Sequence, residues 1–224
     1  MIPDIDLGSY IDHAILSMTA KPEDIEKGCR EAQYFHFPAV CIYPHYVRYA
    51  AEFLHNKKTA ISAVIGFPSG MSTSQTKLYE ACQAVENGAT ELDVMLNLGL
   101  LFAGEFDKLH TEIAEICQET GKPIKAILET NLLDPEQIQI TSEICLQAGV
   151  AYLKTNTGLF GGVKVEHVVL LSRITKGRIG IKASGGIRSF EHALNLIEAG
   201  ATRLGTSRGT QIIEEMLDLQ SKNI

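Results

Sequence analysis

The sequence lacks several features that would place it in large classes of protein. Its five cysteines form no C-x-x-C pair and have no histidine nearby at metal-ligand spacing, so we expect reduced core residues rather than disulfides or zinc ligands. No apolar run approaches the roughly 20 residues that span a bilayer. Residues 1–6 are acidic where a signal peptide would be basic. These absences predict a cytoplasmic protein with no membrane partner.

Positive charge and the common cofactor motifs are also scarce. The chain has 20 Lys and Arg against 27 Asp and Glu, and the resulting net charge of −7 repels a phosphate backbone, so no nucleic-acid partner is expected. Seven histidines are present, but they form no H-x-H or H-E-x-x-H motif. No G-x-G-x-x-G follows an early strand. The sequence therefore indicates neither a metal site nor a dinucleotide site.

What the chain does have is an alternation of short apolar runs with longer stretches of helical periodicity. Hydrophobic residues make up 45% of the 224 positions, enough to bury a sizeable core. Short β-branched or apolar runs predict strands at 10–13, 39–43, 60–67, 91–97, 124–129, 151–155, 179–183 and 203–206. This alternation predicts an α/β fold with a parallel sheet. No linker interrupts it, so one domain is expected over residues 1–224.

A weak internal repeat refines this prediction to a closed barrel. Gly88, Gly149 and Gly200 are each followed, four residues later, by the leucine of a predicted strand. Each glycine fits the left-handed end of a helix, and the copies are about two βα units apart, so they mark strands four, six and eight. Eight such units in a short chain predict a single-domain (β/α)8 TIM barrel, with an open doubly wound sheet as the alternative.

The same repeat singles out chemically active side chains. In a barrel of this kind the active site lies at the C-terminal ends of the strands. The residue after the shared leucine is Asp93 in the first copy, Lys154 in the second and Gly205 in the third. Lys182 lies one unit after Lys154. The pattern predicts that Asp93 and Lys154 face each other at one height, with Lys182 on a neighbouring strand.

Two lysines beside a carboxylate suit Schiff-base chemistry. An amine attacks a carbonyl only when it is neutral, whereas an ordinary lysine, with a pKa of about 10.4, is protonated at pH 7. A second ammonium about 5 Å away opposes that protonation by roughly 3 kcal/mol, so Lys182 is expected to keep Lys154 neutral. The alternative is that both lysines are ion-paired with interior carboxylates such as Asp93 and Glu129 and have no covalent role. Lys125, a rival amine, opens its strand and is expected to be structural.

Small residues after the last strands indicate where an anionic group would bind. Loops at this place in many barrels bind phosphate through backbone N–H groups, and here they contain Gly185, Gly186, Gly205 and Ser207. Arg208 would add a charged contact, although the glycines also suit tight turns. Asp12, at the end of the first predicted strand, either binds substrate hydroxyls or caps a helix.

Several motifs together resemble those of the deoxyribose-phosphate aldolase family. They are I-D-H at 11–13, A-V-C-I-Y-P at 39–44, V-I-G-F-P at 64–68, E-L-D-V at 91–94, L-E-T at 128–130, L-K-T-N-T-G at 153–158, K-A-S-G-G-I-R at 182–188 and G-T-S at 205–207. The resemblance spans nearly the whole chain. Two residues depart from the family pattern beside the expected phosphate end: Asn156 stands where Ser is usual, and Arg208 where a small residue is usual.

The resemblance implies a class I aldolase on a TIM barrel. Such an enzyme reversibly cleaves 2-deoxy-D-ribose 5-phosphate to D-glyceraldehyde 3-phosphate and acetaldehyde, without metal or other cofactor. It implies Lys154 as the Schiff-base lysine, Lys182 as the lysine that keeps it neutral, and Asp93 as the proton donor and acceptor. The positions implied to bind the sugar-phosphate substrate are Asp12, Gly158, Gly185, Gly186, Gly205 and Ser207.

Two other functions stay open at the level of sequence. One is a Schiff-base aldolase that acts on a different sugar phosphate. The other is a barrel that binds a phosphorylated sugar without catalysis, although a binding protein has no need to bury two lysines beside one carboxylate. The oligomeric state is undetermined, a homo-oligomer included.

Overall fold

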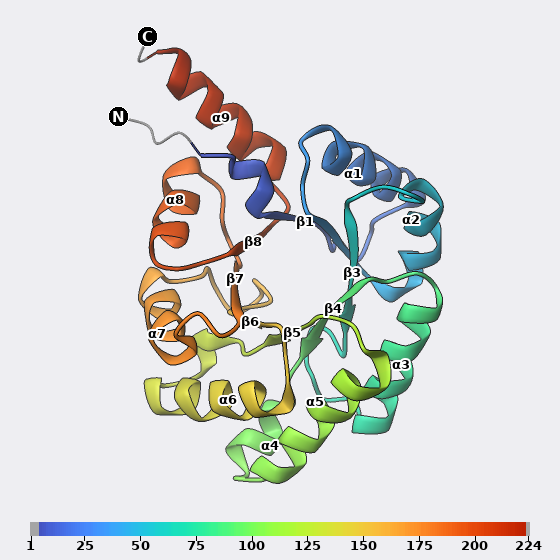
Figure 1. Ribbon diagram of the computed structural model, residues 1–224, viewed down its shortest axis with the longest axis vertical. Coiled ribbons are helices and arrows are strands. Elements are labelled where there is room, and N and C mark those ends of the chain that lie inside the picture. The colour runs from blue at the N-terminus through green and yellow to red at the C-terminus, as the bar shows by residue number, and fades with distance from the viewer. Residues whose placement is uncertain (1–4, 223–224) are drawn as a thin grey trace.

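The strands of the protein close into one parallel barrel. In the computed structural model, which describes residues 5–222, each strand pairs with the next and the last pairs with the first (Figure 1). The strands are β1 (Ile11–Ile15), β2 (Ala39–Ile42), β3 (Ala60–Ile65), β4 (Glu91–Met95), β5 (Ile124–Ile127), β6 (Tyr152–Lys154), β7 (Gly180–Ser184) and β8 (Arg203–Thr206). The predicted (β/α)8 TIM barrel is confirmed, and the repeat does mark β4, β6 and β8. Residues 1–4 and 223–224 of the predicted domain lie outside the described residues.

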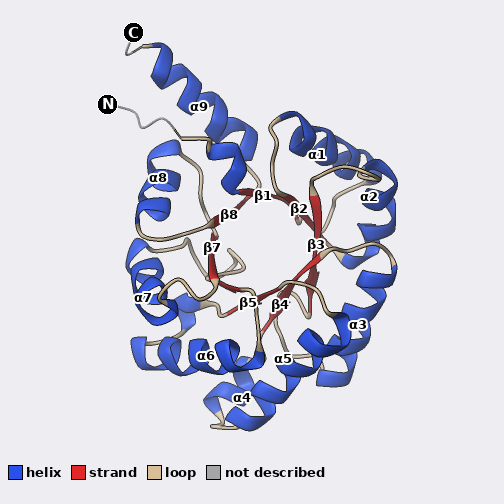
Figure 2. Cartoon of the chain, viewed as in Figure 1, coloured by secondary structure: helices blue, strands red, loops and turns tan. Residues whose placement is uncertain are grey.

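Helices form a ring around the barrel (Figure 2). Those in the described residues are α1 (Pro22–Tyr34), α2 (Val47–Phe53), α3 (Ser74–Glu86), α4 (Leu98–Phe102), α5 (Phe106–Thr120), α6 (Pro135–Ala148), α7 (Val165–Thr175), α8 (Phe190–Glu198) and α9 (Gly209–Ser221). Three short 3-10 helices add to them: η1 (Leu7–Tyr10), η2 (Pro44–Tyr46) and η3 (Thr130–Leu132). No helix in this range is both long and apolar enough to cross a membrane.

Local sequence signals account for where the helices begin and end. Asp134 and Gln137 form a capping box at the start of α6, and Pro135 occupies its first turn. The same helix ends at Gly149, whose φ of 87° is left-handed as predicted. Gly88 and Gly200, which follow the ends of α3 and α8, both have a φ of 113°. The three glycines of the repeat therefore each adopt a positive φ where a helix ends.

Some strand ends differ from the prediction. β1 begins at Ile11 and continues to Ile15, because its pairing with β2 extends as far as Ile15 opposite Ile42. β4 ends at Met95, since Asn97 accepts a hydrogen bond from the N–H of Leu100 and so caps α4. β5 ends at Ile127, and Glu129 then adopts a left-handed backbone with a φ of 55°. Polar residues at the ends of apolar runs thus turn the chain.

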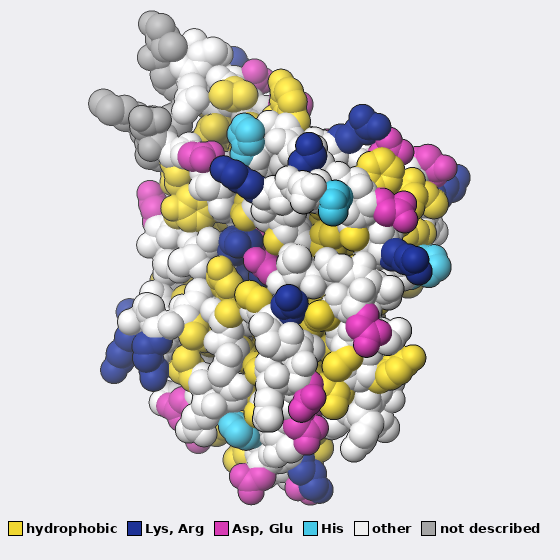
Figure 3. All heavy atoms as spheres, turned by 45° about the vertical axis from the view of Figure 1, so that its right-hand side comes forward, with side chains coloured by type: hydrophobic (Ala, Val, Ile, Leu, Met, Phe, Trp, Pro, Cys, Tyr) yellow, Lys and Arg dark blue, Asp and Glu magenta, His cyan; other side chains and the backbone are white. Residues whose placement is uncertain are grey.

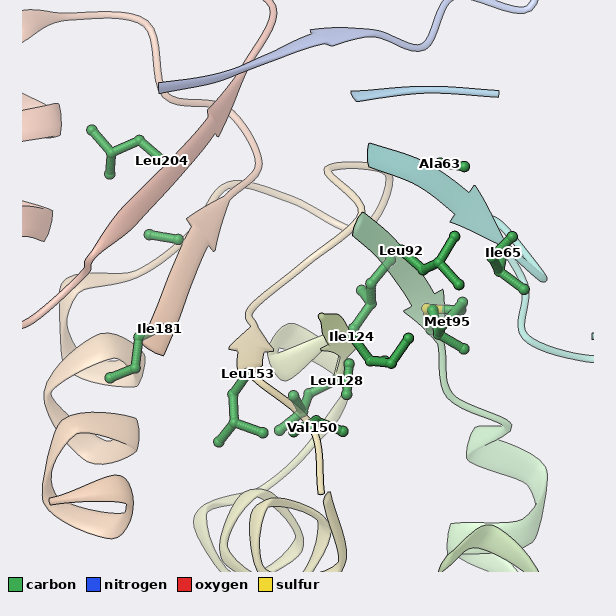
Figure 4. Packing of buried hydrophobic residues seen from close by; sticks show 14 of the residues in the cluster. Ala63, Ile65, Leu92, Met95, Ile124, Leu128, Val150, Leu153, Ile181 and Leu204 are labelled. Carbon is green, nitrogen blue, oxygen red and sulfur yellow. The ribbon is translucent and has the colours of Figure 1, made fainter. Parts of the chain in front are cut away.

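The hydrophobic core lies between the barrel and its helices. Figure 4 shows Leu153, Ile181 and Leu204 pointing from their strands toward the surrounding helices, and all three side chains are buried. Because side chains alternate along a strand, the residues next to these three on each strand point into the barrel. The outer surface carries charges of both signs, interspersed on the face that Figure 3 shows.

Candidate active site

The inside of the barrel is unusually polar. In a staggered barrel the residues of one interior layer come from alternate strands, and such layers are commonly filled by Val, Ile and Leu. The strand register places one layer at Cys41, Asp93, Lys154 and Gly205, and the layer beneath it at Asp12, Ser62, Lys125 and Lys182. Asp93 and Lys154 therefore share a height, as the repeat predicts.

Asp93 is the carboxylate that joins the two layers. Its Oδ2 lies 2.8 Å from Nζ of Lys154 and 2.8 Å from Nζ of Lys182. Its Oδ1 accepts hydrogen bonds from Ser62 Oγ at 2.6 Å and Lys125 Nζ at 2.9 Å. Burial alone would raise the pKa of Asp93, but the neighbouring lysines, Lys125 first among them, outweigh burial and hold this pKa well below its ordinary value of 3.8. Asp93 is thus a carboxylate throughout the neutral range.

Asp12 does not lie at the strand end that the sequence suggests. β1 continues beyond it, so its side chain is fully buried in the lower layer. Its carboxylate lies 2.6 Å from Lys182 Nζ and 2.6 Å from Arg203 Nη1. The prediction that Asp12 caps a helix is wrong, and it does not line the pocket described below, where it would meet substrate hydroxyls. Instead it helps Asp93 to raise the pKa of Lys182, against the lowering that burial causes.

Ion pairs connect these side chains into one group, which we call the interior charge cluster. Its members are Asp12, Glu91, Asp93, Lys125, Lys154, Lys182 and Arg203. Uncompensated charge is costly inside a protein, and three carboxylates balance only three of the four cations. Lys154 has one carboxylate partner in the cluster, whereas Lys125 has three. A neutral Lys154 would balance the cluster.

A pocket of about 950 Å³ opens above the cluster, at the C-terminal ends of the strands. Lys154 and Lys182 line it, and the Phe67 ring centroid lies 5.9 Å from Lys154 Nζ. Five more of the residues singled out in the sequence line the same pocket: Gly158, Gly185, Gly186, Gly205 and Ser207. Asp93 and Asp12 do not line it. Both lysines therefore face the pocket, whereas the two carboxylates that pair with them lie inside the barrel away from it.

Two of the glycines are required by packing. A Cβ on Gly205 would lie 2.8 Å from Ser184 Cβ and 3.0 Å from Lys182 Cε, so this position must be small for Lys182 to enter the barrel. Gly185 has a φ of 108°, and a Cβ there would lie 3.2 Å from the Cα of Gly158. The loops after β6 and β7 thus approach each other backbone to backbone. Arg188 and Arg208 line the pocket beside them and add positive charge.

Sequence reasoning missed part of the cluster. Ser62, Glu91 and Arg203 are not among the predicted residues, although each is followed on its strand by a buried apolar residue and so faces inward with the lysines. Lys125 was expected to be structural, and it contacts carboxylates of both layers without lining the pocket. Glu129, a partner of the lysines only in the alternative without a covalent role, accepts hydrogen bonds from Thr157 instead. Among residues 5–222, no group of three His, Cys, Asp or Glu side chains is arranged to hold a metal ion.

Fold and site together define a (β/α)8 barrel enzyme whose pocket ends on buried amines. Residues 6–214 match the family model described as DeoC/LacD family aldolase. The chain belongs to this family, and it is a lyase of the aldolase type.

Individual relatives agree with this placement. The deoxyribose-phosphate aldolase of Trichormus variabilis is 56% identical over 213 residues, which cover 95% of this chain and 94% of that protein. The one from Carboxydothermus hydrogenoformans is 41% identical over 223 residues, with 97% and 98% covered. Among solved structures, the tetrameric deoxyribose phosphate aldolase of Aeropyrum pernix matches with a TM-score of 0.89 and 32% identity, covering 95% of this chain and 92% of that one.

Proposed function

We propose that this enzyme reversibly cleaves 2-deoxy-D-ribose 5-phosphate to D-glyceraldehyde 3-phosphate and acetaldehyde, through an imine on Lys154. One observation carries the proposal: Lys154 Nζ borders the pocket and lies 2.8 Å from Asp93 in a charge cluster that balances when this amine is neutral. A neutral amine at the base of a pocket is what imine formation needs. The names of the relatives supply the substrate.

In the proposed reaction, the neutral Lys154 amine adds to the C1 aldehyde of the open-chain sugar. The resulting carbinolamine takes up one proton and loses water, which leaves an iminium ion. A proton then leaves the 3-hydroxyl, the C2–C3 bond breaks, and its electron pair forms an enamine that stays on Lys154. Glyceraldehyde 3-phosphate departs. Protonation at C2 and hydrolysis release acetaldehyde and restore the amine. Asp93, next to Lys154 Nζ, exchanges protons there, while Asp12 keeps Lys182 a permanent cation.

The phosphate of the substrate would lie at the opposite end of the pocket from the reacting amine. Gly158, Gly185 and Gly186 offer backbone there, with Ser207 as a hydroxyl donor. Arg188 and Arg208, which line the same pocket, match the charge of the phosphate. Gly205 contributes backbone as well as space for Lys182. Asp12 has no part in this assignment.

Assembly and location are part of the same proposal. The tetramer of the Aeropyrum pernix relative supports a homo-oligomer, to be measured by light scattering. The cysteines are free in the described chain, which favours a reducing compartment such as the cytoplasm, to be checked by cell fractionation.

The test combines product release with covalent trapping. We expect the enzyme to release acetaldehyde from deoxyribose 5-phosphate, and borohydride with substrate to add mass to the peptide that contains Lys154. Lys154→Met should lose both signals, and label on Lys125 or Lys182 would contradict the assignment. Trapping with a different sugar phosphate alone would indicate another aldolase. Binding with neither trapping nor product would indicate a non-catalytic barrel.

A further inference from the structure

Three side chains form a hydrogen-bonded chain behind the pocket. His167 of α7 has its Nδ1 2.8 Å from Thr130 Oγ1, and Thr130 Oγ1 lies 3.0 Å from Asn156 Oδ1. Thr130 and Asn156 are fully buried, and the His167 ring is half-buried. None of the three lines the pocket. These hydrogen bonds therefore link an outer helix, α7, to the segment that directly follows Lys154.

The chemistry of these groups fixes the direction of the chain. An amide oxygen only accepts hydrogen bonds, so the single hydrogen of the Thr130 hydroxyl is donated to Asn156. Thr130 must then accept from His167, which requires a proton on Nδ1. Burial and Lys164 lower the pKa of His167, so the ring is neutral above pH 7 and the Nδ1–H tautomer is a specific requirement.

The Asn156 amide depends on this single contact. Its Nδ2 is buried and has no hydrogen-bond partner among the described residues. If Thr130 Oγ1 instead donated to His167, the amide could turn over and present Nδ2 to Thr130. A proton on Nδ1 of His167 therefore favours the orientation seen here, in which Asn156 Oδ1 faces Thr130.

Asn156 in turn supports the glycines at the phosphate end of the pocket. Its backbone carbonyl accepts a hydrogen bond from Ser184 Oγ at 2.6 Å, and a Cβ on Gly185 would lie 3.5 Å from Asn156 Cβ. The next residue, Thr157, donates its N–H to Glu129 at 2.9 Å, and Gly158 then packs on Gly185. A displaced Asn156 side chain would therefore shift the loops after both β6 and β7.

We propose that His167 is a positioning residue for the phosphate end of the pocket, acting through Thr130 and Asn156. It touches neither the pocket nor the amines, so its loss should change recognition of the phosphate more than the chemistry at Lys154. This inference rests on the proposed function for its substrate.

The test compares a phosphorylated with an unphosphorylated sugar. The readout is the ratio of kcat/KM for deoxyribose 5-phosphate to kcat/KM for deoxyribose. We expect this ratio to fall about tenfold in His167→Leu and in Thr130→Val, mainly through KM for the phosphorylated sugar. His167→Asn should restore it, because the Asn Nδ2 stands where His Nδ1 does. His110→Leu, which removes another half-buried histidine, is the matched control and should leave the ratio unchanged.

A second measurement does not depend on activity. Nitrogen-15 NMR of histidine-labelled wild-type enzyme at pH 7.5 should show a ring protonated on Nδ1 and bare on Nε2, a signal that is absent from His167→Leu. An Nε2–H tautomer at His167 would overturn the proposal, as would an unchanged ratio in Thr130→Val. If the wild type released no acetaldehyde, the proposed function would fail. The positioning role would then be decided by the affinity for inorganic phosphate. This affinity should be weaker in Thr130→Val than in the wild type, and it should keep the wild-type value in His167→Asn.

Discussion

Lys154 and Lys182 are register partners on neighbouring parallel strands, and their two ammonium nitrogens lie at the same distance, 2.8 Å, from one oxygen of Asp93. Their other surroundings differ. Both lysines line the pocket and both are buried, but Lys182 has a second carboxylate partner, Asp12, whereas Lys154 lies beside the Phe67 ring. Two equivalent positions in the sheet thereby have unequal surroundings: two carboxylates hold Lys182 as a cation, and Lys154 is the amine that we propose reacts.

Replacing Lys182 by Met should protonate Lys154. The substitution leaves Asp12, Glu91 and Asp93 facing only Lys125 and Arg203, so a protonated Lys154 restores the balance. Loss of a neighbouring charge commonly moves a pKa by about two units, so kcat/KM at pH 7 should fall about 10²-fold and recover partly in alkali. A pH–rate profile of both proteins checks this. If kcat/KM of the variant rose with pH over the same range as that of the wild type, the prediction would be contradicted.

Asp93→Asn should leave the Lys154 amine neutral and still lower turnover strongly. The substitution removes the only carboxylate partner of Lys154 in the cluster. A nearby carboxylate favours the protonated form of an amine, so its loss leaves the amine neutral. A positioned general acid or base commonly contributes about 10²–10⁴-fold, and kcat should fall by that factor. The measurement pairs turnover with the rate at which an amine-reactive reagent labels Lys154. Loss of labelling in a folded variant would mean that Asp93 only organises the lysines.

Gly205→Ala should damage the chemistry rather than phosphate binding. The new methyl group would lie 2.8 Å from Ser184 Cβ and 3.0 Å from Lys182 Cε, so it displaces the lysine. Overpacking of this kind typically costs about 1–3 kcal/mol of stability. We expect a lower kcat with little change in KM, measured together with urea unfolding. An altered KM at unchanged kcat would place the role of Gly205 at the phosphate.

Gly186→Val should produce the converse result. Gly186 is exposed on the pocket loop with a φ of 66°, which a β-branched residue adopts only with strain. KM for deoxyribose 5-phosphate should rise about tenfold or more, while reaction with unphosphorylated deoxyribose changes little. Equal losses for the two sugars would indicate a folding defect instead.

His13 should make the protein less stable in mild acid. The residue is 5% exposed, and burial lowers its pKa although Glu31, 2.9 Å away, opposes the shift. Below pH 6.5 the unfolded chain therefore binds a proton that the folded protein does not, so the free energy of unfolding falls with falling pH, by at most about 1.4 kcal/mol per pH unit. Urea unfolding from pH 7.5 to 5 should give a shallower pH dependence for His13→Asn than for the wild type. His55→Asn, which removes an exposed histidine, should keep the wild-type slope.

The sequence by itself determined the barrel and the two lysines. Apolar alternation and the glycines at 88, 149 and 200 specify local structure, and closing eight βα units leaves few topologies. Strand periodicity also predicts that Asp93, Lys154 and Lys182 point inward. Side chains alternate between the two faces of a strand, and each of these residues directly follows an apolar residue that faces the helices. These inferences need only contacts between residues close in the chain.

Only the tertiary structure decided how the charges pair. Asp12 and Arg203 are 191 positions apart in the sequence and form an ion pair, and the place of Asp12 beside Lys182 in the lower layer depends on the stagger of β1 against β8. One residue of shift there would turn Asp12 out of the barrel. The path from His167 through Thr130 to Asn156 likewise joins three elements. Interactions of this kind leave no periodic pattern in the sequence. The periodicity of a strand or helix determines which way each side chain points, but only closure of the barrel determines which side chain it meets.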